Sequence, residues 1–165
     1  MIIGIGGCSR SGKSTLAKTL AAQKSSPKIL SLDDYTFPEN NLPIVGNRYN
    51  WEIPEAYDFD RLLQDINGNR SDCLFVEGIL VFYDPRVVAL LDTKIFISIE
   101  KDTFFRRRKL ETRWGNEPDW FLEYVWASYT NYGQIKLDDN YVVISGENKN
   151  HLESLTTEID RYKII

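Results

Sequence analysis

Short apolar runs alternate along the chain with segments whose apolar residues recur at helical spacing. Five of these runs are four to six residues long and are bounded by polar or turn residues, which is typical of buried strands. The predicted strands cover residues 2–6, 28–32, 73–76, 94–99 and 141–144. Because successive positions in them are apolar, we expect helices to cover both faces of the sheet.

Helical patterns fill most of the intervals between these strands. In the first of them, Leu16, Ala17 and Leu20 share one face of the predicted helix. The predicted helices cover residues 13–23, 59–66, 103–110, 120–132 and 152–162. Residues 35–57 instead hold three prolines and many polar side chains, so they are predicted to form a loop-rich excursion.

Alternation of strands and helices predicts an α/β fold with one parallel sheet of five strands. In such sheets ligands bind at the carboxyl ends of the strands. Three groups of polar residues follow directly on predicted strands and are therefore expected to meet there: the loop of residues 7–14, the pair Asp33 and Asp34, and Glu77.

Composition narrows the class of protein. The 165 residues fit one domain spanning residues 1–165, and the net charge of −4 argues against nucleic acid as the main partner. Two cysteines and one histidine leave no disulfide framework and no zinc site. No apolar run reaches the roughly 18 residues of a membrane span, and the start lacks the basic segment of a signal peptide. We expect a cytoplasmic protein without a membrane partner, either a monomer or a small homo-oligomer.

Aromatic residues are abundant, at 13% of the chain. Some of these rings are expected to line a binding site rather than to fill the core. Within residues 120–132, however, Trp120, Phe121 and Tyr124 fit one helical stripe, which predicts that they pack in the core.

Residues 7–14 read G-C-S-R-S-G-K-S and match the G-x-x-x-x-G-K-[ST] motif between a predicted strand and a predicted helix. Glycines allow backbone N–H groups to turn toward phosphate oxygens, and the helix N-terminus adds partial positive charge. Lys13 is expected to reach the β- and γ-phosphates of ATP, and the Ser14 hydroxyl to ligate Mg²⁺. The predicted fold is therefore a three-layer P-loop NTPase type. The predicted ATP-binding residues are Gly7, Ser9, Ser11, Gly12, Lys13, Ser14, Thr15 and Arg113.

Carboxylates at two strand ends suit phosphoryl transfer. Glu77 ends a strand beside the P-loop strand, where it can hold Mg²⁺ directly or through water. Asp33 and Asp34 offer a carboxylate that accepts the proton of an acceptor hydroxyl, although either can also serve as a helix cap or turn residue. The residues alone do not choose between these two acids.

Four arginines precede a break at residues 115–119, and guanidinium groups suit phosphate oxygens. A small lid over residues 106–119 is predicted, although a solvated basic helix face would read the same way. Arg106, Arg107 and Arg108 point in different directions on a helix, so at most two can share one site. In the excursion, Trp51 beside Glu52 suits a flat base and ribose hydroxyls, while the alternative is a tryptophan that anchors a loop.

Together these motifs resemble the uridine kinase and nicotinamide riboside kinase family of P-loop nucleoside kinases. The resemblance rests on the P-loop, on S-L-D-D-Y at 31–35, on N-W-E at 50–52 with P-E-A-Y-D at 54–58, on V-E-G at 76–78, and on R-R-R at 106–108 with T-R at 112–113. The P-D-W-F stretch at 118–121 and the aromatics up to residue 132 resemble the nicotinamide riboside kinase branch most.

The resemblance implies transfer of the γ-phosphate of MgATP to the 5′-hydroxyl of a riboside. It implies Asp33 as general base, with Lys13 as the second catalytic residue, and Mg²⁺ held by Ser14 and Glu77. The implied substrate-binding residues are Asp33, Trp51, Glu52, Arg108 and Trp114. Glu52 stands where the family usually has aspartate, and the base-stacking tyrosine of the lid has no clean counterpart, since its position falls near Gly115 beside Trp114.

The expected function is therefore that of an ATP-dependent nucleoside kinase acting on nicotinamide riboside, uridine or cytidine. Two alternatives remain open at this stage. One is a P-loop kinase for another small metabolite such as pantothenate or a pentose phosphate. The other is a regulatory ATPase without a small-molecule acceptor.

Overall fold

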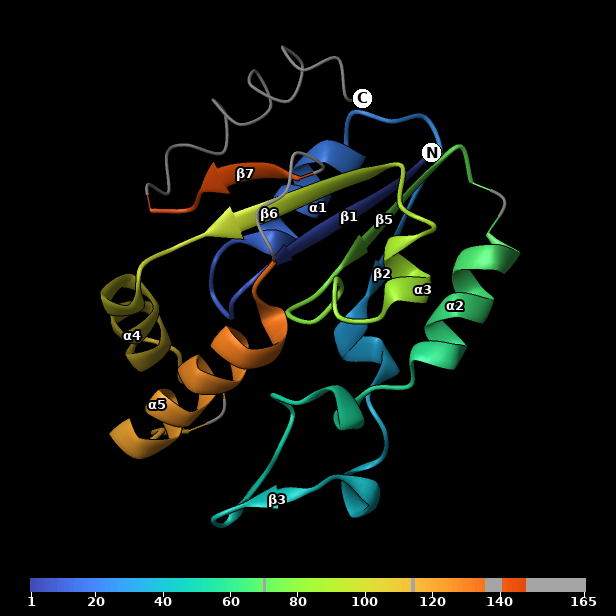
Figure 1. Cartoon of the computed structure of the whole chain (residues 1–165). Helices are drawn as coiled ribbons and strands as arrows, with labels where there is room; N and C mark the ends of the chain where they lie inside the picture. The colour runs from blue at the N-terminus through green and yellow to red at the C-terminus, as the bar shows by residue number, and fades with distance from the viewer. Residues whose placement is uncertain (70, 114, 136–140, 148–165) are drawn as a thin grey trace.

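A computed structural model describes residues 1–69, 71–113, 115–135 and 141–147. It contains one parallel sheet of five strands in the order β2-β5-β1-β6-β7. These strands are β1 (Ile2–Gly7), β2 (Pro27–Ser31), β5 (Cys73–Glu77), β6 (Thr93–Ser98) and β7 (Val142–Ser145). The predicted α/β fold with a five-stranded parallel sheet is confirmed (Figure 1).

The helices lie on both sides of this sheet, as the continuous apolar strands predict. They are α1 (Lys13–Ala21), α2 (Phe59–Gly68), α3 (Pro85–Val88), α4 (Lys101–Lys109) and α5 (Asp119–Ser128). In β5, Cys73 and Phe75 pack with α1, whereas Leu74 and Val76 pack in the cluster that holds α2 and α3. This alternation on a strand buried on both faces produces the three layers.

A third apolar cluster fastens α4 and α5 to the sheet. Phe96 of β6 packs there with Phe104 of α4 and with Phe121, Leu122 and Val125 of α5. Both helices lie beyond the carboxyl ends of the strands, which are the arrowheads in Figure 1.

Residues 35–57 form the predicted excursion from the sheet. It contains short elements only: the end of η1 (Leu32–Tyr35), η2 (Glu39–Asn41), β3 (Ile44–Val45), β4 (Arg48–Tyr49) and η3 (Pro54–Ala56). Strands β3 and β4 form an antiparallel hairpin, which projects away from the sheet in Figure 1.

Several details differ from the sequence-based expectations. The α-helix α5 ends at Ser128 and continues as a π-helical turn, η4 (Tyr129–Gly133). Of the stripe expected in the core, Phe121 is buried, but Trp120 is 47% exposed. Trp120 lies instead against Gly46 in the turn of the β3–β4 hairpin, so it covers the excursion rather than the sheet. The helix predicted at residues 152–162 lies outside the described residues.

Candidate active site

A cleft of about 1120 Å³ lies at the carboxyl ends of the strands. Its walls come from the P-loop, η1, the excursion, the end of β5, α4 with the segment after it, and the end of β7. Most of the residues selected from the sequence line this one cleft: Ser9, Ser11, Gly12, Lys13, Ser14, Thr15, Asp33, Trp51, Glu52, Glu77, Arg108 and Arg113. Gly7 is not part of the lining, and Trp114 lies outside the described residues.

The P-loop joins β1 to α1 through backbone conformations that favour glycine. Gly12 precedes the helix with φ of 111°, and Gly7 has φ of 140°. A Cβ atom at Gly7 would collide with the carbonyl oxygen of Ile97, so a side chain there would push β6 away. Lys13 is buried and its Nζ donates to the carbonyl oxygen of Cys8 at 2.9 Å, which folds the ammonium over its own loop.

Glu77 lies buried at the end of β5, with two hydroxyl groups directed at one of its carboxylate oxygens. Ser14 Oγ donates to Glu77 Oε1 at 3.0 Å, and Ser31 Oγ donates to the same atom at 2.8 Å. The parallel pairing of β1 with β5 and of β2 with β5 brings these groups together. This cluster of hard oxygen atoms beside the P-loop matches the ligand preference of Mg²⁺.

Asp33 and Asp34 sit in the single turn of η1, directly after β2. Asp33 lines the cleft, whereas Asp34 does not. The backbone carbonyl of Asp34 accepts a hydrogen bond from Arg61 of α2, which fixes the turn from the other side. Asp33 is therefore the acid of this pair that faces the cleft.

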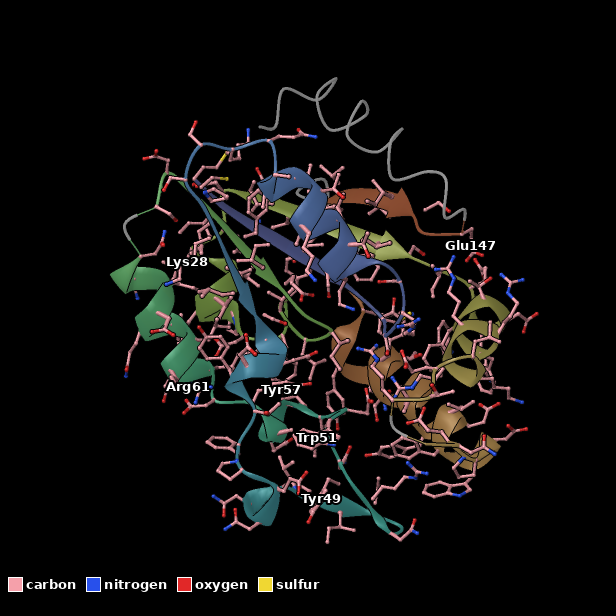
Figure 2. The ribbon with its side chains drawn as sticks, turned by 180° about the vertical axis from the view of Figure 1, so that it is seen from behind. Lys28, Tyr49, Trp51, Tyr57, Arg61 and Glu147 are labelled. Carbon is pink, nitrogen blue, oxygen red and sulfur yellow. The ribbon has the colours of Figure 1, made fainter. Side chains whose placement is uncertain are left out.

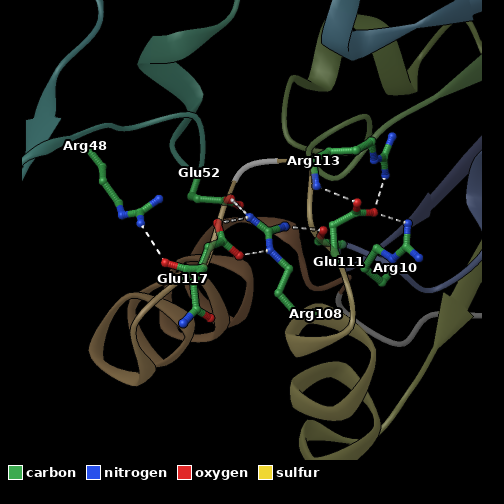
Figure 3. A network of polar contacts seen from close by, with 9 residues as sticks. Arg10, Arg48, Glu52, Arg108, Glu111, Arg113 and Glu117 are labelled. Atoms are coloured by element: carbon green, nitrogen blue, oxygen red, sulfur yellow. Dashed lines mark hydrogen bonds and ion pairs between the residues drawn. The ribbon is translucent and has the colours of Figure 1, made fainter.

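A buried cluster of charges crosses the cleft next to Asp33. Arg108 of α4 donates to both carboxylate oxygens of Glu117, at 2.6 and 3.0 Å, and lies 3.7 Å from Glu52 (Figure 3). The same guanidinium donates to Ser9 Oγ in the P-loop. All three charged side chains of this cluster are at most 8% exposed. Arg108 thus connects α4 with the P-loop, the excursion and the segment before α5.

Burial dominates the electrostatics of Glu52. Desolvation raises the pKa of this carboxyl to about 7; the charge of Arg108 lowers the pKa, and the charges of Glu117 and Asp33 raise it. Burial alone would lower the pKa of Arg108, but its hydrogen bond to Glu117 and the charge of Glu52 raise that pKa. Arg108 therefore stays charged, while Glu52 changes its protonation state near neutral pH.

Trp51 lies between the core and the cleft. It lines the cleft and packs partly against the core, and its backbone carbonyl accepts a hydrogen bond from Tyr57 Oη at 2.8 Å. Its ring meets Tyr49 edge to face, with 6.3 Å between the ring centroids. Figure 2 shows Trp51 and Tyr57 at the root of the excursion and Tyr49 farther out. A flat ring therefore stands beside Glu52 in the wall of the cleft.

The arginines of α4 diverge, as helical geometry predicts. Arg107 and Arg108 line the cleft and Arg106 does not. Arg107 donates to the carbonyl oxygens of Arg10, Gly146 and Glu147, at 3.2, 2.7 and 2.9 Å, and so connects the P-loop to the loop after β7. Arg113 donates to Glu111 Oε2 at 2.7 Å.

Sequence reasoning missed four charged residues of this region: Arg10, Arg48, Glu111 and Glu117. Arg10 forms an ion pair of 2.7 Å with Glu111, which is 101 positions away. Arg48 stacks over Phe121 at 5.0 Å from the ring centroid and donates to the carbonyl oxygen of Asn116 at 3.3 Å. Glu111 and Glu117 carried a local signal, because they lie three and nine positions after Arg108 within the predicted lid.

The described residues offer neither a metal-binding cluster of histidine, cysteine or acidic side chains nor a membrane-spanning helix. No group of three or more histidine, cysteine, aspartate or glutamate side chains there is placed to bind a metal ion. None of the helices in those residues is both long and apolar enough to cross a membrane. Burial also raises the pKa of the Cys8 thiol to about 12, which keeps it protonated and a poor nucleophile.

Known proteins similar to this chain are kinases. No family model matches the chain. The nicotinamide riboside kinase of Eremothecium gossypii is 26% identical, with 78% of this chain and 74% of that protein covered. Human nicotinamide riboside kinase 1 is 27% identical, with 87% and 81% covered. Uridine kinase-like protein 3 of Arabidopsis thaliana is 27% identical over 65% of this chain, which spans 29% of that longer protein.

Solved structures with a similar fold are P-loop kinases as well. A possible uridine kinase from Bacillus stearothermophilus matches with a TM-score of 0.55 and 19% identity, over 86% of this chain and 87% of that one. A shikimate kinase from Bacteroides thetaiotaomicron matches with a TM-score of 0.60 and 18% identity, over 100% and 99%. At these identities the likeness concerns the fold. The expected resemblance is thus confirmed: in sequence the chain is similar to nicotinamide riboside kinases and uridine kinase-like proteins, and its fold is that of the P-loop kinases.

Proposed function

We propose that this protein is an ATP-dependent kinase that transfers the γ-phosphate to the 5′-hydroxyl of a nucleoside, with nicotinamide riboside, uridine and cytidine as the acceptors to test first. One observation carries the proposal: a single cleft contains both a P-loop with Lys13 and a wall in which Asp33, Trp51 and Glu52 lie together. A nucleotide-hydrolysing switch needs the first feature only. The similarity to nicotinamide riboside kinases and uridine kinase-like proteins supports the same acceptor class.

The phosphate side of the cleft is proposed to bind ATP. The backbone N–H groups of the P-loop and the N-terminus of α1 face the phosphates, and Lys13 exchanges its contact with the Cys8 carbonyl for a phosphate oxygen. Arg113 and Arg108 add guanidinium groups from the lid side. These donors neutralise the charge that builds up on the transferred group.

Ser14 and Glu77 are the residues that would hold Mg²⁺. Their oxygen atoms already lie 3.0 Å apart at the edge of the P-loop, and the buried Glu77 carboxylate faces two hydroxyl groups. A bound Mg²⁺ would supply charge neutralisation at the β- and γ-phosphates. Two protein ligands are enough, because Mg²⁺ keeps water and phosphate oxygens in its other positions.

The acceptor side is proposed to orient the riboside. Glu52 and Arg108 face the ribose hydroxyls, and the ring of Trp51 lies against the base. Asp33 accepts the proton of the 5′-hydroxyl as its oxygen attacks the γ-phosphorus. The bond between that phosphorus and the β–γ bridging oxygen breaks, and ADP leaves.

The test is turnover of ATP to ADP by the purified protein with Mg²⁺ and one acceptor at a time. The acceptors are nicotinamide riboside, uridine, cytidine, pantothenate and ribose. We expect one riboside to stimulate turnover well above the rate without acceptor and to be recovered as its 5′-phosphate. The same slow ATP turnover in every reaction, without a phosphorylated product, would reject the kinase proposal.

A further inference from the structure

One carboxylate, Glu111, connects an arginine of the P-loop to an arginine of the predicted lid. Its Oε2 atom accepts from Arg10 Nη1 and from Arg113 Nη2, both at 2.7 Å. Its Oε1 atom accepts from the backbone N–H of Arg113 at 3.0 Å. Figure 3 shows the three side chains side by side, next to the cluster around Arg108.

Glu111 is the least exposed of the three side chains and is not part of the cleft lining. Arg10 and Arg113 both line the cleft, whereas Glu111 does not. The Glu111 side chain is 8% exposed, compared with 38% for Arg10 and 63% for Arg113. The carboxylate therefore contacts both guanidinium groups while they remain at the cleft surface. A guanidinium has five N–H donors, so the hydrogen bond from Arg10 Nη1 to Glu111 leaves Arg10 with donors for a ligand in the cleft.

The backbone at Arg10 supports a role for its side chain. Among the described residues that are not glycine, Arg10 is the one with a positive φ, 65°. This conformation is unfavourable for an arginine, and asparagine or glycine would adopt it more readily. Two contacts hold it: the ion pair with Glu111 and the hydrogen bond from Arg107 Nη1 to the Arg10 carbonyl at 3.2 Å.

We propose that Arg10 is a further contact for the triphosphate of ATP, and that Glu111 is the positioning residue that holds Arg10 and Arg113 as a pair on the phosphate side of the cleft. This inference rests on the proposed kinase function. The two arginines and Glu111 together carry a net charge of +1, which adds to the attraction of Lys13 for phosphate. One arginine belongs to the P-loop and the other to the lid segment. The shared carboxylate therefore also holds these two segments next to each other.

The arrangement remains ionised throughout the neutral range. Hydrogen bonds from Arg113 and the charge of Arg10 lower the pKa of Glu111 to about 2. Effects of changing Glu111 are therefore effects of its charge and its contacts, and they do not depend on pH between about 5 and 9.

The test compares Arg10→Asn, Glu111→Gln and the double variant with the native protein in steady-state kinetics. Asparagine tolerates the positive φ, and glutamine keeps the shape and the hydrogen bond to the Arg113 backbone. The matched control is Glu123→Gln, which breaks an exposed ion pair of 2.8 Å between α5 and Lys101 of α4, away from the cleft.

Each single variant is expected to raise the KM for MgATP about 2- to 5-fold, since the pair is partly exposed, and to leave the KM for the acceptor unchanged. The double variant should raise it by less than the product of the single effects, because Glu111 acts partly through Arg10. The control should match the native protein in both constants.

Two results would overturn the inference while the native protein remains an active kinase. One is an unchanged KM for MgATP in both single variants. The other is an equal rise in both KM values, which would indicate a general structural defect. A native protein without acceptor-stimulated turnover would instead reject the proposed function, so the two failures are distinguishable.

Discussion

Lys13 is buried, and its ammonium group contacts a backbone carbonyl oxygen of its own loop. Its ammonium donates to the Cys8 carbonyl, which water can also satisfy once the side chain is gone. We therefore expect Lys13→Ala to lower turnover about 10²- to 10³-fold by removing charge at the transferred phosphate, and to change the free energy of unfolding by only about 1 kcal/mol. Acceptor-stimulated ATP turnover and thermal unfolding measure the two effects. Near-native turnover in this variant would contradict the mechanism.

The neighbouring acids Asp33 and Asp34 provide an internal control for the general base. Asp33 faces the cleft, whereas the fixed contact of Asp34 is made by its backbone carbonyl, which a side-chain change leaves intact. Asp33→Asn should lower kcat about 10²- to 10⁴-fold, and Asp34→Asn should leave kcat close to native. If the loss occurs in Asp34→Asn alone, the base has been assigned one residue too early.

Glu52 should make binding of the acceptor dependent on pH. With a pKa of about 7, the carboxyl becomes an ionised acceptor for ribose hydroxyls as the pH rises from 6 to 8. The KM for the riboside should therefore fall over this range, by at most about tenfold, which is the change in the ionised fraction. The KM for MgATP should stay flat, and Glu52→Gln should abolish the trend. A riboside KM that is independent of pH in the native protein would contradict this role.

The raised pKa of Glu52 also makes the free energy of unfolding depend on pH, which can be measured separately. Because folding raises the pKa of Glu52 from 4.5 to about 7, the folded state binds more protons between these values, and its stability falls as the pH rises through them. Relative to the native protein, Glu52→Gln should gain about 1–3 kcal/mol between pH 4.5 and 7.5 and then level off. Chemical unfolding at several pH values tests this, and a constant difference would show that the shift is absent.

At the scale of elements, continuous apolar runs were enough to locate the five strands, with ends within one or two residues of those observed. The short elements escaped prediction for a physical reason. Helix α3 has four residues and the β3–β4 hairpin pairs two residues with two, so neither offers a full period of side chains to read. The prediction that Trp120 packs in the core was wrong. A helical stripe does not show whether its side chains pack on the sheet or, as Trp120 does, against the excursion.

Some residues of the candidate site could also be predicted from local sequence, and others could not. The P-loop, Asp33 and Glu77 each follow a strand within a few residues, so local pattern and parallel topology place them at one sheet edge. The pairing of Arg10 with Glu111 joins two segments across 101 positions, and nothing periodic connects them in the sequence. Such contacts depend on where α4 ends relative to the P-loop, which only the folded chain defines.

The turn of η1 is held against β5 by a close approach at Gly78. A Cβ atom there would come within 3.0 Å of Leu32 Cδ2 and still closer to Leu32 Cβ. Gly78→Ala should therefore push η1 outward, cost about 1–3 kcal/mol in the free energy of unfolding, and lower kcat by displacing Asp33. The KM for MgATP should change less than kcat, because the P-loop follows β1 and only Glu77 of the proposed MgATP site adjoins Gly78.

Gly68→Ala is the matched control for that change. Gly68 ends α2, and an added Cβ would meet nothing within 4 Å. This variant should keep native kcat and be neutral or stabilised by up to about 1 kcal/mol. Steady-state kinetics and thermal unfolding of both alanine variants test this prediction. Equal kcat values in the two variants would show that the position of η1 does not control Asp33.

At the scale of the whole molecule, the cleft is where separately packed parts of the fold meet. Three apolar clusters each support one wall of the cleft. The cluster under α1 supports the P-loop, the cluster under α2 and α3 supports η1 and the excursion, and the cluster of α4 and α5 supports the segment after α4. Two charged side chains connect these parts: Arg108 contacts Ser9, Glu52 and Glu117, and Arg107 contacts the carbonyl oxygen of Arg10. A ligand that pairs with these charges should therefore stabilise all three parts at once.

Because the cleft exists only in the folded chain, MgATP should protect the fold against unfolding. MgATP at about 100 times its Kd should add about 2.7 kcal/mol and raise the Tm by roughly 5–10 °C for a domain of this size. Removal of Mg²⁺ with a chelator should reduce the shift, because Ser14 and Glu77 then face the phosphates without the cation. Lys13→Ala should reduce it further. Thermal unfolding with and without the nucleotide measures these shifts, and the Glu123→Gln protein serves as the control with a native response. An equal shift with and without Mg²⁺ would remove the metal from the proposed binding mode, whereas no shift at all would remove ATP from the cleft.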